Sequence, residues 1–397
     1  MPGLSQKFSR ISESQTVALN SLMAKMKREG RDVVALGAGE PDFDTPQHIK
    51  DAAIAAIRQG KTKYTPADGT MDLKEAISKW LADEYGTVYK PSEIIVTPGA
   101  KYAVFQALLA VCNPGDEVLL PVPYWVSYPE QVKLAGAVLK PLETDQSTGL
   151  KITPEQLDRA ITDKTKVLIL NSPSNPSGAV YSAKELEGLA KVIEKRGIYV
   201  ISDEIYDKIV YDGVPFASMT KYPEIREQLL LVNGVSKSFA MTGWRIGYLA
   251  APQEIATAVK KYQGHTTSNP TSISQYAALS GMNGPKEFIN EMMKAFTERR
   301  NYVHTRLTNM PGVSCMLPQG AFYAFPDFSG YMGTSQDGIE INSSIDLCGY
   351  LLEKFDVAIV PGIAFGMDTH ARLSFATSME ILEKALDRIE RGLASLK

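Results

Sequence analysis

The sequence predicts an α/β protein built on a mostly parallel sheet covered by helices in a large domain, with a smaller α+β domain. Two observations predict this fold class. Between residues 93 and 232, short continuous apolar runs end in small polar clusters, and helical patterns lie between them. Continuous apolar runs are typical of strands buried on both faces of a parallel sheet. After about residue 290 the pattern changes to a long charged helix, short strands and a terminal helix.

Five strands are expected in the large domain, each followed by a polar cluster. They are "EIIVT" (93–97) before "PGAK", "EVLLPV" (117–122) before "PYW", "VLIL" (167–170) before "NSPSNPSG", "YVIS" (199–202) before "DEIY", and "LLLV" (229–232) before "NGVSK". Segments such as "AKELEGLAKVIEKRG" are expected to form the covering helices. Ligands of such sheets bind beyond the carboxyl ends of the strands, so the five clusters should converge on one site.

The smaller domain is expected to begin with the helix "FINEMMKAFTERRNYVHTRL". Short strands should follow at "GAFYAFPDF", "VAIVPG" and "RLSFAT", and a terminal helix from about Met379. We therefore expect a large domain of residues 48–289 and a discontinuous small domain of residues 1–47 and 290–397.

Composition excludes several classes of partner. The 397 residues carry a net charge of -3 without a dense Lys/Arg run, so a nucleic-acid partner is not expected. No apolar stretch approaches the roughly 18 residues that span a bilayer, and the N-terminus has no signal-like apolar region. The three cysteines and four histidines have no ligand-like spacing, so no metal is expected. We expect a soluble cytoplasmic protein that binds small molecules.

The stretch "GVSKSFAMTGWRIGY" (234–248) contains two candidate site residues. Desolvation and a nearby cation could lower the pKa of Lys237 enough to leave neutral amine, as Schiff-base chemistry requires. The alternative is a solvated turn. Arg245 could grip a phosphate through two hydrogen bonds, or form a structural ion pair.

Further candidates follow the other strands. "TPGAK" (97–101) leads into an apolar helix and could seat an anion at its N-terminus, or be a plain turn. Asp203 needs a cationic partner if it stays ionised in a buried setting, and a protonated ring nitrogen would serve; the alternative is a helix N-cap. Trp125 offers a ring for stacking or belongs to the core. Asn175 lies between two prolines, which fix its amide or form a rigid turn.

Together these candidates supply an amine, a phosphate clamp, an acid for a pyridine nitrogen and a stacking ring. One cofactor demands this combination, pyridoxal 5'-phosphate.

Motifs along nearly the whole chain resemble one family. They are "LGAGEPDFDTP" (36–46), "KYTPADG" (63–69), "PYWVSYPE", "NSPSNPSGAVY", "SDEIY", "SKSFAMTGWRIGYLA" and "ARLSFATS" (371–378). In this order they resemble the class I aminotransferases, which are fold-type I pyridoxal-phosphate enzymes. The resemblance is to the prokaryotic aspartate aminotransferase subgroup that includes prephenate aminotransferases.

The resemblance implies roles for residues that bind the cofactor. Lys237 would bind it covalently and then move the substrate proton. Asp203 would keep the pyridine nitrogen protonated, and Trp125 would stack on the ring. The remaining cofactor contacts would come from Gly99, Ala100, Lys101, Ser236 and Arg245 at the phosphate, from Asn175 and Tyr206 at the ring hydroxyl, and from Tyr64 of a neighbouring subunit.

The resemblance also implies how substrate is bound. Arg372 would clamp the α-carboxylate, assisted by the backbone at Gly39 and by Asn175 and Trp125. No arginine lies between Arg245 and Arg299. Lys101, with Thr16, would therefore receive the distal carboxylate.

The implied activity is a homodimeric aminotransferase that exchanges amino groups between aspartate or glutamate and 2-oxo acids by a ping-pong mechanism. Prephenate is a further candidate acceptor. The alternatives are a transaminase for aromatic or neutral amino acids, a lyase acting at the β-carbon, and a non-catalytic regulator on the same fold.

Overall fold

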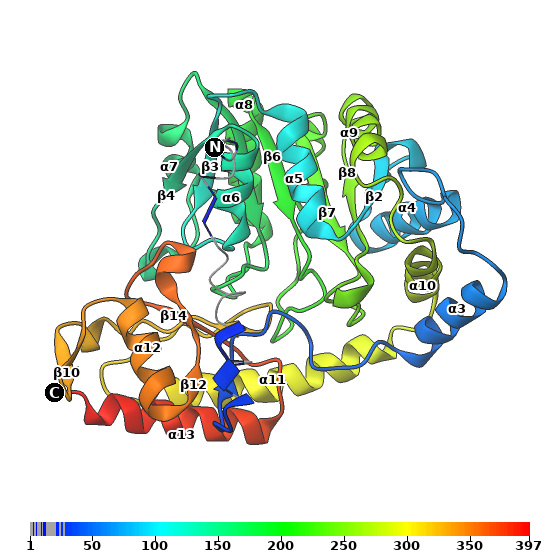
Figure 1. The fold of residues 1–397 in the computed structure, drawn as a ribbon. Helices are drawn as coiled ribbons and strands as arrows, with labels where there is room; N and C mark the ends of the chain where they lie inside the picture. Colours follow the sequence, from blue (N-terminus) through cyan, green and yellow to red (C-terminus); the bar gives the residue numbers. More distant parts are fainter. Residues whose placement is uncertain are drawn as a thin grey trace.

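The computed structural model describes residues 3, 5, 9, 11, 12, 21–23, 25, 26 and 28–397. A seven-stranded sheet forms its centre, in the order β2-β8-β7-β6-β5-β3-β4 (Figure 1). Its strands are β2 (Ile94–Thr97), β3 (Glu117–Pro121), β4 (Val138–Leu142), β5 (Thr165–Asn171), β6 (Tyr199–Asp203), β7 (Leu229–Gly234) and β8 (Gly247–Ala250). Only β8 runs antiparallel to its neighbours in this sheet. The predicted α/β fold with a mostly parallel sheet is confirmed.

Both faces of the sheet are buried, which explains the continuous apolar runs. Val118 and Leu120 pack into the core cluster that contains helix α5, whereas Leu119 between them packs against helix α8. Side chains alternate between the faces of a strand, so burial on both faces requires an apolar residue at every position. The covering helices are α3 (Gln47–Arg58), α4 (Met71–Tyr85), α5 (Ala100–Val111), α6 (Ser127–Leu134), α7 (Pro154–Ala160), α8 (Ala183–Arg196), α9 (Gln253–Thr266) and α10 (Ser272–Asn283).

Helix α8 shows how local sequence sets the ends of these elements. Ser182 accepts a hydrogen bond from the Glu185 amide, and the Glu185 side chain accepts one from the Ser182 amide. This capping box satisfies amide groups that have no partner within the helix. Gly197, at a φ of 68°, ends the helix in the left-handed conformation that glycine adopts without strain.

The remaining elements lie at one end of the central sheet (Figure 1). They are α11 (Glu287–Thr308), α12 (Ser344–Phe355) and α13 (Met379–Ser395), with the short strands β1 (Val34–Ala35), β9 (Tyr323–Ala324), β10 (Thr334–Gln336), β11 (Ile339–Ile341), β12 (Val357–Ala358), β13 (Val360–Pro361) and β14 (Ala371–Ser374). Strand β1 pairs with β12, which joins the beginning of the chain to its C-terminal part. The domain boundaries at residues 48 and 290 stay a prediction.

Within the described residues, no helix has the length and apolar character needed to cross a membrane.

Candidate active site

A cavity of about 470 Å³ lies at the carboxyl ends of the central strands. The segments after five strands contribute to its lining: Lys101 after β2, Trp125 after β3, Asn175 after β5, Asp203 at the end of β6, and Lys237 after β7. Other predicted site residues that line it are Gly39, Ala100, Tyr206, Ser236, Arg245 and Arg372. The structure therefore brings together segments that are spread over most of the chain.

The Lys237 amine is a reactive group in this cavity. Its Nζ donates a hydrogen bond to the Gly39 carbonyl. Burial lowers the pKa of Lys237 to about 8; the positive charges of Arg372 and Arg245 also lower it, and the carboxylates of Glu40 and Asp203 oppose the shift. A substantial neutral fraction therefore exists near pH 8, which a lysine in water would not have.

This shift predicts the pH dependence of Lys237 acylation in the cofactor-free protein. The reactive species is the neutral amine, so the rate should rise with pH and reach half its maximum near pH 8. Mass spectrometry of the Lys237 peptide after timed exposure to a small acylating reagent would measure this rate. A midpoint near the ordinary lysine value of about 10.4 would contradict the prediction.

Asp203 is a buried carboxylate at the end of β6, with 3% of its surface exposed. Burial raises the pKa of Asp203 to about 6. Two donors oppose that rise: the Tyr128 hydroxyl at 2.8 Å and the Ile205 amide at 3.2 Å. No helix begins at this point, so the alternative role of Asp203 as a helix N-cap is wrong. A cation in the cavity would relieve its desolvation.

The turn before α5 and the turn containing Arg245 meet beside the cavity. Gly99 precedes α5 at a φ of 85°, and a side chain there would collide with the Arg245 guanidinium. Gly99 itself is not part of the cavity lining. Arg245 donates hydrogen bonds to the Thr242 carbonyl at 2.9 Å and the Pro98 carbonyl at 3.4 Å. It has no carboxylate partner among the described residues, so the guanidinium and the helix N-terminus together suit an anion such as phosphate.

Arg372 is a buried cation without an acidic partner in the described part of the chain; 2% of it is exposed. Its Nη1 donates to Asn175 Oδ1 at 2.9 Å and its Nη2 to the Gly37 carbonyl at 2.8 Å. Its buried Nε has no partner among the described residues. Burying an unpaired charge is costly, so the arrangement suits an anionic ligand.

The hydroxyl groups of Tyr206 and Tyr323 are hydrogen-bonded to each other, at 2.8 Å. The Arg372 guanidinium lies 4.5 Å from the centre of the Tyr323 ring. Tyr323 therefore contacts two predicted site residues, Tyr206 and Arg372, although it was not among the residues predicted from the sequence. Tyr128, which donates a hydrogen bond to Asp203, was also not predicted. A tyrosine in a helix or strand carries no sequence signal that separates a site role from a core role.

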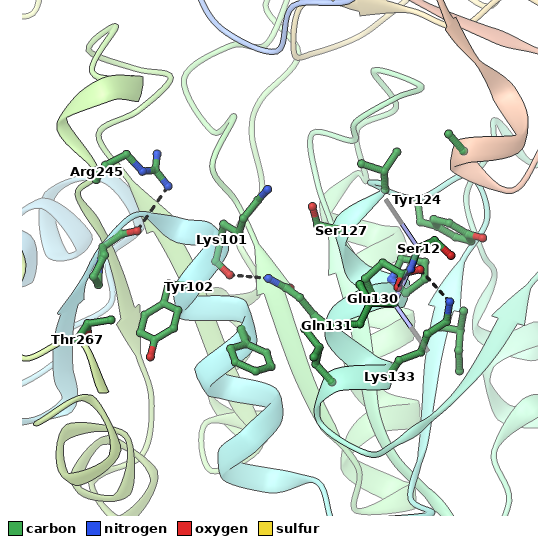
Figure 2. A pocket seen from close by; sticks show the side chains of 18 of the residues that line it. Ser12, Lys101, Tyr102, Tyr124, Ser127, Glu130, Gln131, Lys133, Arg245 and Thr267 are labelled. Atoms are coloured by element: carbon green, nitrogen blue, oxygen red, sulfur yellow. Dashed lines mark hydrogen bonds and ion pairs between the residues drawn. The ribbon is translucent and has the colours of Figure 1, made fainter. Parts of the chain in front are cut away.

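A second cavity, of about 760 Å³, adjoins the cavity that contains Lys237. Lys101 and Arg245 line both cavities. Figure 2 shows Lys101 on α5, with Arg245 on one side and Ser12, Glu130 and Lys133 on the other. Its Nζ lies 4.9 Å from the centre of the Trp125 ring. Desolvation and the positive charge of Arg245 lower the pKa of Lys101.

The structure does not place two predicted residues, Tyr64 and Thr16, at this site. Tyr64 is 92% exposed and lines neither cavity. Thr16 lies outside the described residues.

The charged residues that line the smaller cavity are four basic and two acidic side chains: Lys101, Lys237, Arg245, Arg372, Glu40 and Asp203. This excess of positive charge favours anionic ligands. In the described part of the chain, no group of three or more His, Cys, Asp or Glu is placed to hold a metal ion.

The sequence profile described as "Aminotransferase class I and II" matches residues 31–389. The chain belongs to this aminotransferase family. It is 47% identical to the aspartate aminotransferase of Geobacillus stearothermophilus over 389 residues, covering 98% of each chain. It is 45% identical to the aspartate/prephenate aminotransferase of Cereibacter sphaeroides, covering 100% of each chain. The solved structure of the Rhizobium meliloti aspartate aminotransferase matches it with a TM-score of 0.97 at 43% identity, again covering 100% of each chain.

Proposed function

We propose that this aminotransferase exchanges amino groups between aspartate or glutamate and 2-oxo acids, with pyridoxal 5'-phosphate as cofactor. The observation that carries the proposal is one cavity that contains the low-pKa amine of Lys237, the buried carboxylate of Asp203 and the unpaired buried cation of Arg372. The names of the full-length relatives support it.

The residues of the cavity fit the proposed cofactor. The buried carboxylate of Asp203 suits a protonated pyridine nitrogen, since each charge offsets the desolvation of the other. The phosphate suits the guanidinium of Arg245 and the amide groups at the start of α5. When bound, pyridoxal 5'-phosphate supplies an electron sink for the electron pair that remains when the substrate α-proton leaves.

The protein moves that proton through Lys237. A neutral Nζ can accept the proton from the substrate α-carbon, and the resulting ammonium can release it again; a pKa of about 8 suits both directions near neutral pH. Asp203 would hold a proton on the ring nitrogen, and the Tyr128 hydroxyl donates a hydrogen bond that orients the Asp203 carboxylate. Asn175 and Tyr206 line the same cavity and are proposed to bind the ring hydroxyl.

The substrate is proposed to bind through both of its carboxylates. Arg372 takes the α-carboxylate, because its guanidinium is held by Asn175 and Gly37 and has no acidic partner in the described part of the chain. Lys101 takes the distal carboxylate, because its Nζ lies beside Trp125 at the border of the larger cavity. Prephenate also has two carboxylates, and the adjoining cavity of about 760 Å³ has room for its ring. We therefore propose prephenate as an additional acceptor.

Lys101→Ala should reduce activity with dicarboxylic substrates selectively. It would leave the distal carboxylate without a partner, which should lower kcat/KM for aspartate by about 30-fold to several thousand-fold. Phenylalanine and alanine make no such contact and should be affected far less. Steady-state kinetics at saturating cofactor would measure the ratio of the two losses. Lys133→Ala, at the rim of the same larger cavity, is the matched control. Equal losses for aspartate and phenylalanine would contradict the role of Lys101.

The active protein is proposed to be a homodimer in which Tyr64 completes the phosphate site of the other subunit. An aromatic side chain that is 92% exposed suits a protein interface better than a free surface. The three free cysteines are compatible with a reducing compartment, and we propose a cytoplasmic location.

Subunit exchange tests the shared site. Lys237→Ala and Tyr64→Phe chains should be impaired as homodimers, but a hybrid dimer would contain one site with neither change. Activity should therefore reappear on mixing. A fully active monomer at sedimentation equilibrium would contradict the shared site.

A substrate panel tests the proposed reaction as a whole. Purified protein with added cofactor should convert aspartate and glutamate in preference to tyrosine and alanine, with 2-oxoglutarate, oxaloacetate or prephenate as acceptors. Preference for tyrosine would favour an aromatic transaminase, and release of ammonia and pyruvate from a β-substituted substrate would favour a lyase. A protein that binds the cofactor and turns over no substrate would favour the regulator.

A further inference from the structure

The loop between α3 and α4 combines an exposed beginning with a fixed interior. Tyr64 is 92% exposed, and its hydroxyl has no partner in the described part of the chain. Asp68, four residues later, is 4% exposed and forms an ion pair with Lys74 at 2.6 Å. Asp68 is therefore held inside the protein, whereas the Tyr64 side chain projects from it.

Gln275 on α10 holds the second half of this loop at two points. Its side chain is completely buried. Its Oε1 accepts a hydrogen bond from the Thr70 amide at 2.8 Å, and its Nε2 donates to Thr65 Oγ1 at 3.0 Å and to the Pro270 carbonyl at 2.8 Å. One side chain thus fixes both Thr65, which follows Tyr64, and Thr70, which directly precedes α4.

The middle of the loop is fixed to strand β2. The Val96 amide donates to the Asp68 carbonyl at 3.0 Å, and the buried Gln263 Nε2 donates to the carbonyls of Ala67 and Val96. A side chain at Gly69 would collide with Val96, so the loop lies directly on the strand. These contacts hold the middle of the loop against the strand through hydrogen bonds from buried donors.

We infer that Gln275 is a positioning residue that sets the direction of Tyr64 and so strengthens cofactor binding in the partner subunit. The inference rests on the proposed shared site. The amide of Gln275 bonds the loop at Thr65 and Thr70, and a tyrosine on an unrestrained loop would pay a larger entropy cost on reaching a phosphate. Gln275 acts through the loop, since it is buried within its own subunit and lines neither cavity.

Gln275→Met keeps the length of the side chain and removes its three hydrogen bonds. We expect the dimer to bind pyridoxal 5'-phosphate about five- to tenfold more weakly, and Tyr64→Phe to weaken binding at least as much. Absorbance titration of the cofactor-free protein would measure the affinity. The double variant should lose no more than Tyr64→Phe alone. Gln228→Met is the matched control. The Gln228 side chain also makes more than one hydrogen bond, to the carbonyls of Ile193 and Ile198, but it lies directly before β7, away from this loop.

Hybrid dimers separate this role from a general loss of structure. A hybrid of one Gln275→Met chain and one Lys237→Ala chain, purified through two different tags, retains Lys237 only in the Gln275→Met subunit. The Tyr64 that serves this site comes from the other chain, whose loop is intact. The visible absorption of the lysine-linked cofactor, which reports only this site, should titrate with wild-type affinity.

Two results would overturn the inference. Weak binding at the Lys237 site of the hybrid would show that Gln275 acts within its own subunit, and wild-type affinity of the Gln275→Met homodimer would show that the loop does not need it. If the Tyr64→Phe variant binds pyridoxal 5'-phosphate with wild-type affinity, Tyr64 does not contribute to the partner's site, and the inference about Gln275 is wrong as well. If Gln275→Met fails to fold, Thr65→Val removes one of the same bonds at the loop, and the same titrations apply.

Discussion

Lys237→Ala is expected to lose transamination by about 10⁴-fold or more while the protein still binds its cofactor. The variant removes the proposed base for the substrate α-proton, and Lys101 is the one other lysine of the described residues that lines the cavity. Arg245, Asp203 and the start of α5 remain to hold the phosphate and ring. Single-turnover kinetics with aspartate, together with absorbance of the bound cofactor, would measure both effects.

Lys237→Arg serves as the control for charge at this position. It keeps a cation in the cavity, but its guanidinium does not lose a proton at neutral pH and cannot act as the base. It should therefore be as inactive as the alanine variant. Turnover within tenfold of the wild type in either variant would show that another group moves the proton.

Asp203→Asn is expected to bind the cofactor more weakly and to lose most of its activity. A neutral amide cannot hold the ring nitrogen proton through a charge-assisted bond, which is worth about 1.5–3 kcal/mol. The catalytic loss should exceed the corresponding loss of affinity, because the electron sink is weakened as well. Affinity titration and kcat measurements would separate the two, and near-normal turnover would contradict the role of Asp203.

The same substitution should have the opposite effect on the stability of the cofactor-free protein. Burial raises the pKa of Asp203 to about 6, so the folded protein holds its proton more tightly than the unfolded chain does. The contribution of Asp203 to stability is therefore lost as pH rises from about 4 through 6. Above pH 6 the asparagine variant should melt at a higher temperature than the cofactor-free wild type, and thermal unfolding at pH 8 would show this. A lower melting temperature would contradict the assigned burial cost.

The sequence predicted the central sheet where its strands are buried on both faces. Val118, Leu119 and Leu120 are all apolar because neighbours on one strand face different helix layers. Strands β4 and β8 were missed. Val138 in β4 is 44% exposed on an edge strand, so that strand lacks the continuous apolar pattern. Strand β8 has four residues and follows directly on the Arg245 turn, which attracted the functional interpretation instead.

The site was predicted less completely than the fold. Residues at strand ends could be selected because topology brings those ends together, and Lys237 and Asp203 are of this kind. Tyr128 and Tyr323 could not be selected, because their roles depend on which hydroxyl or carboxylate their side chains reach in three dimensions. Tyr64 lies outside both cavities of its own chain, so its predicted role depends on a second subunit.

Borohydride reduction of the cofactor-loaded protein tests the central claim most directly. The loaded protein should be yellow, and reduction should fix the cofactor to the chain through a stable carbon–nitrogen bond. Proteolysis and mass spectrometry should then place the adduct on Lys237, in the peptide that contains "SKSFAMTGWR", with no comparable adduct on Lys101. An adduct on a different lysine, or none after reduction of the loaded protein, would contradict the assignment of Lys237.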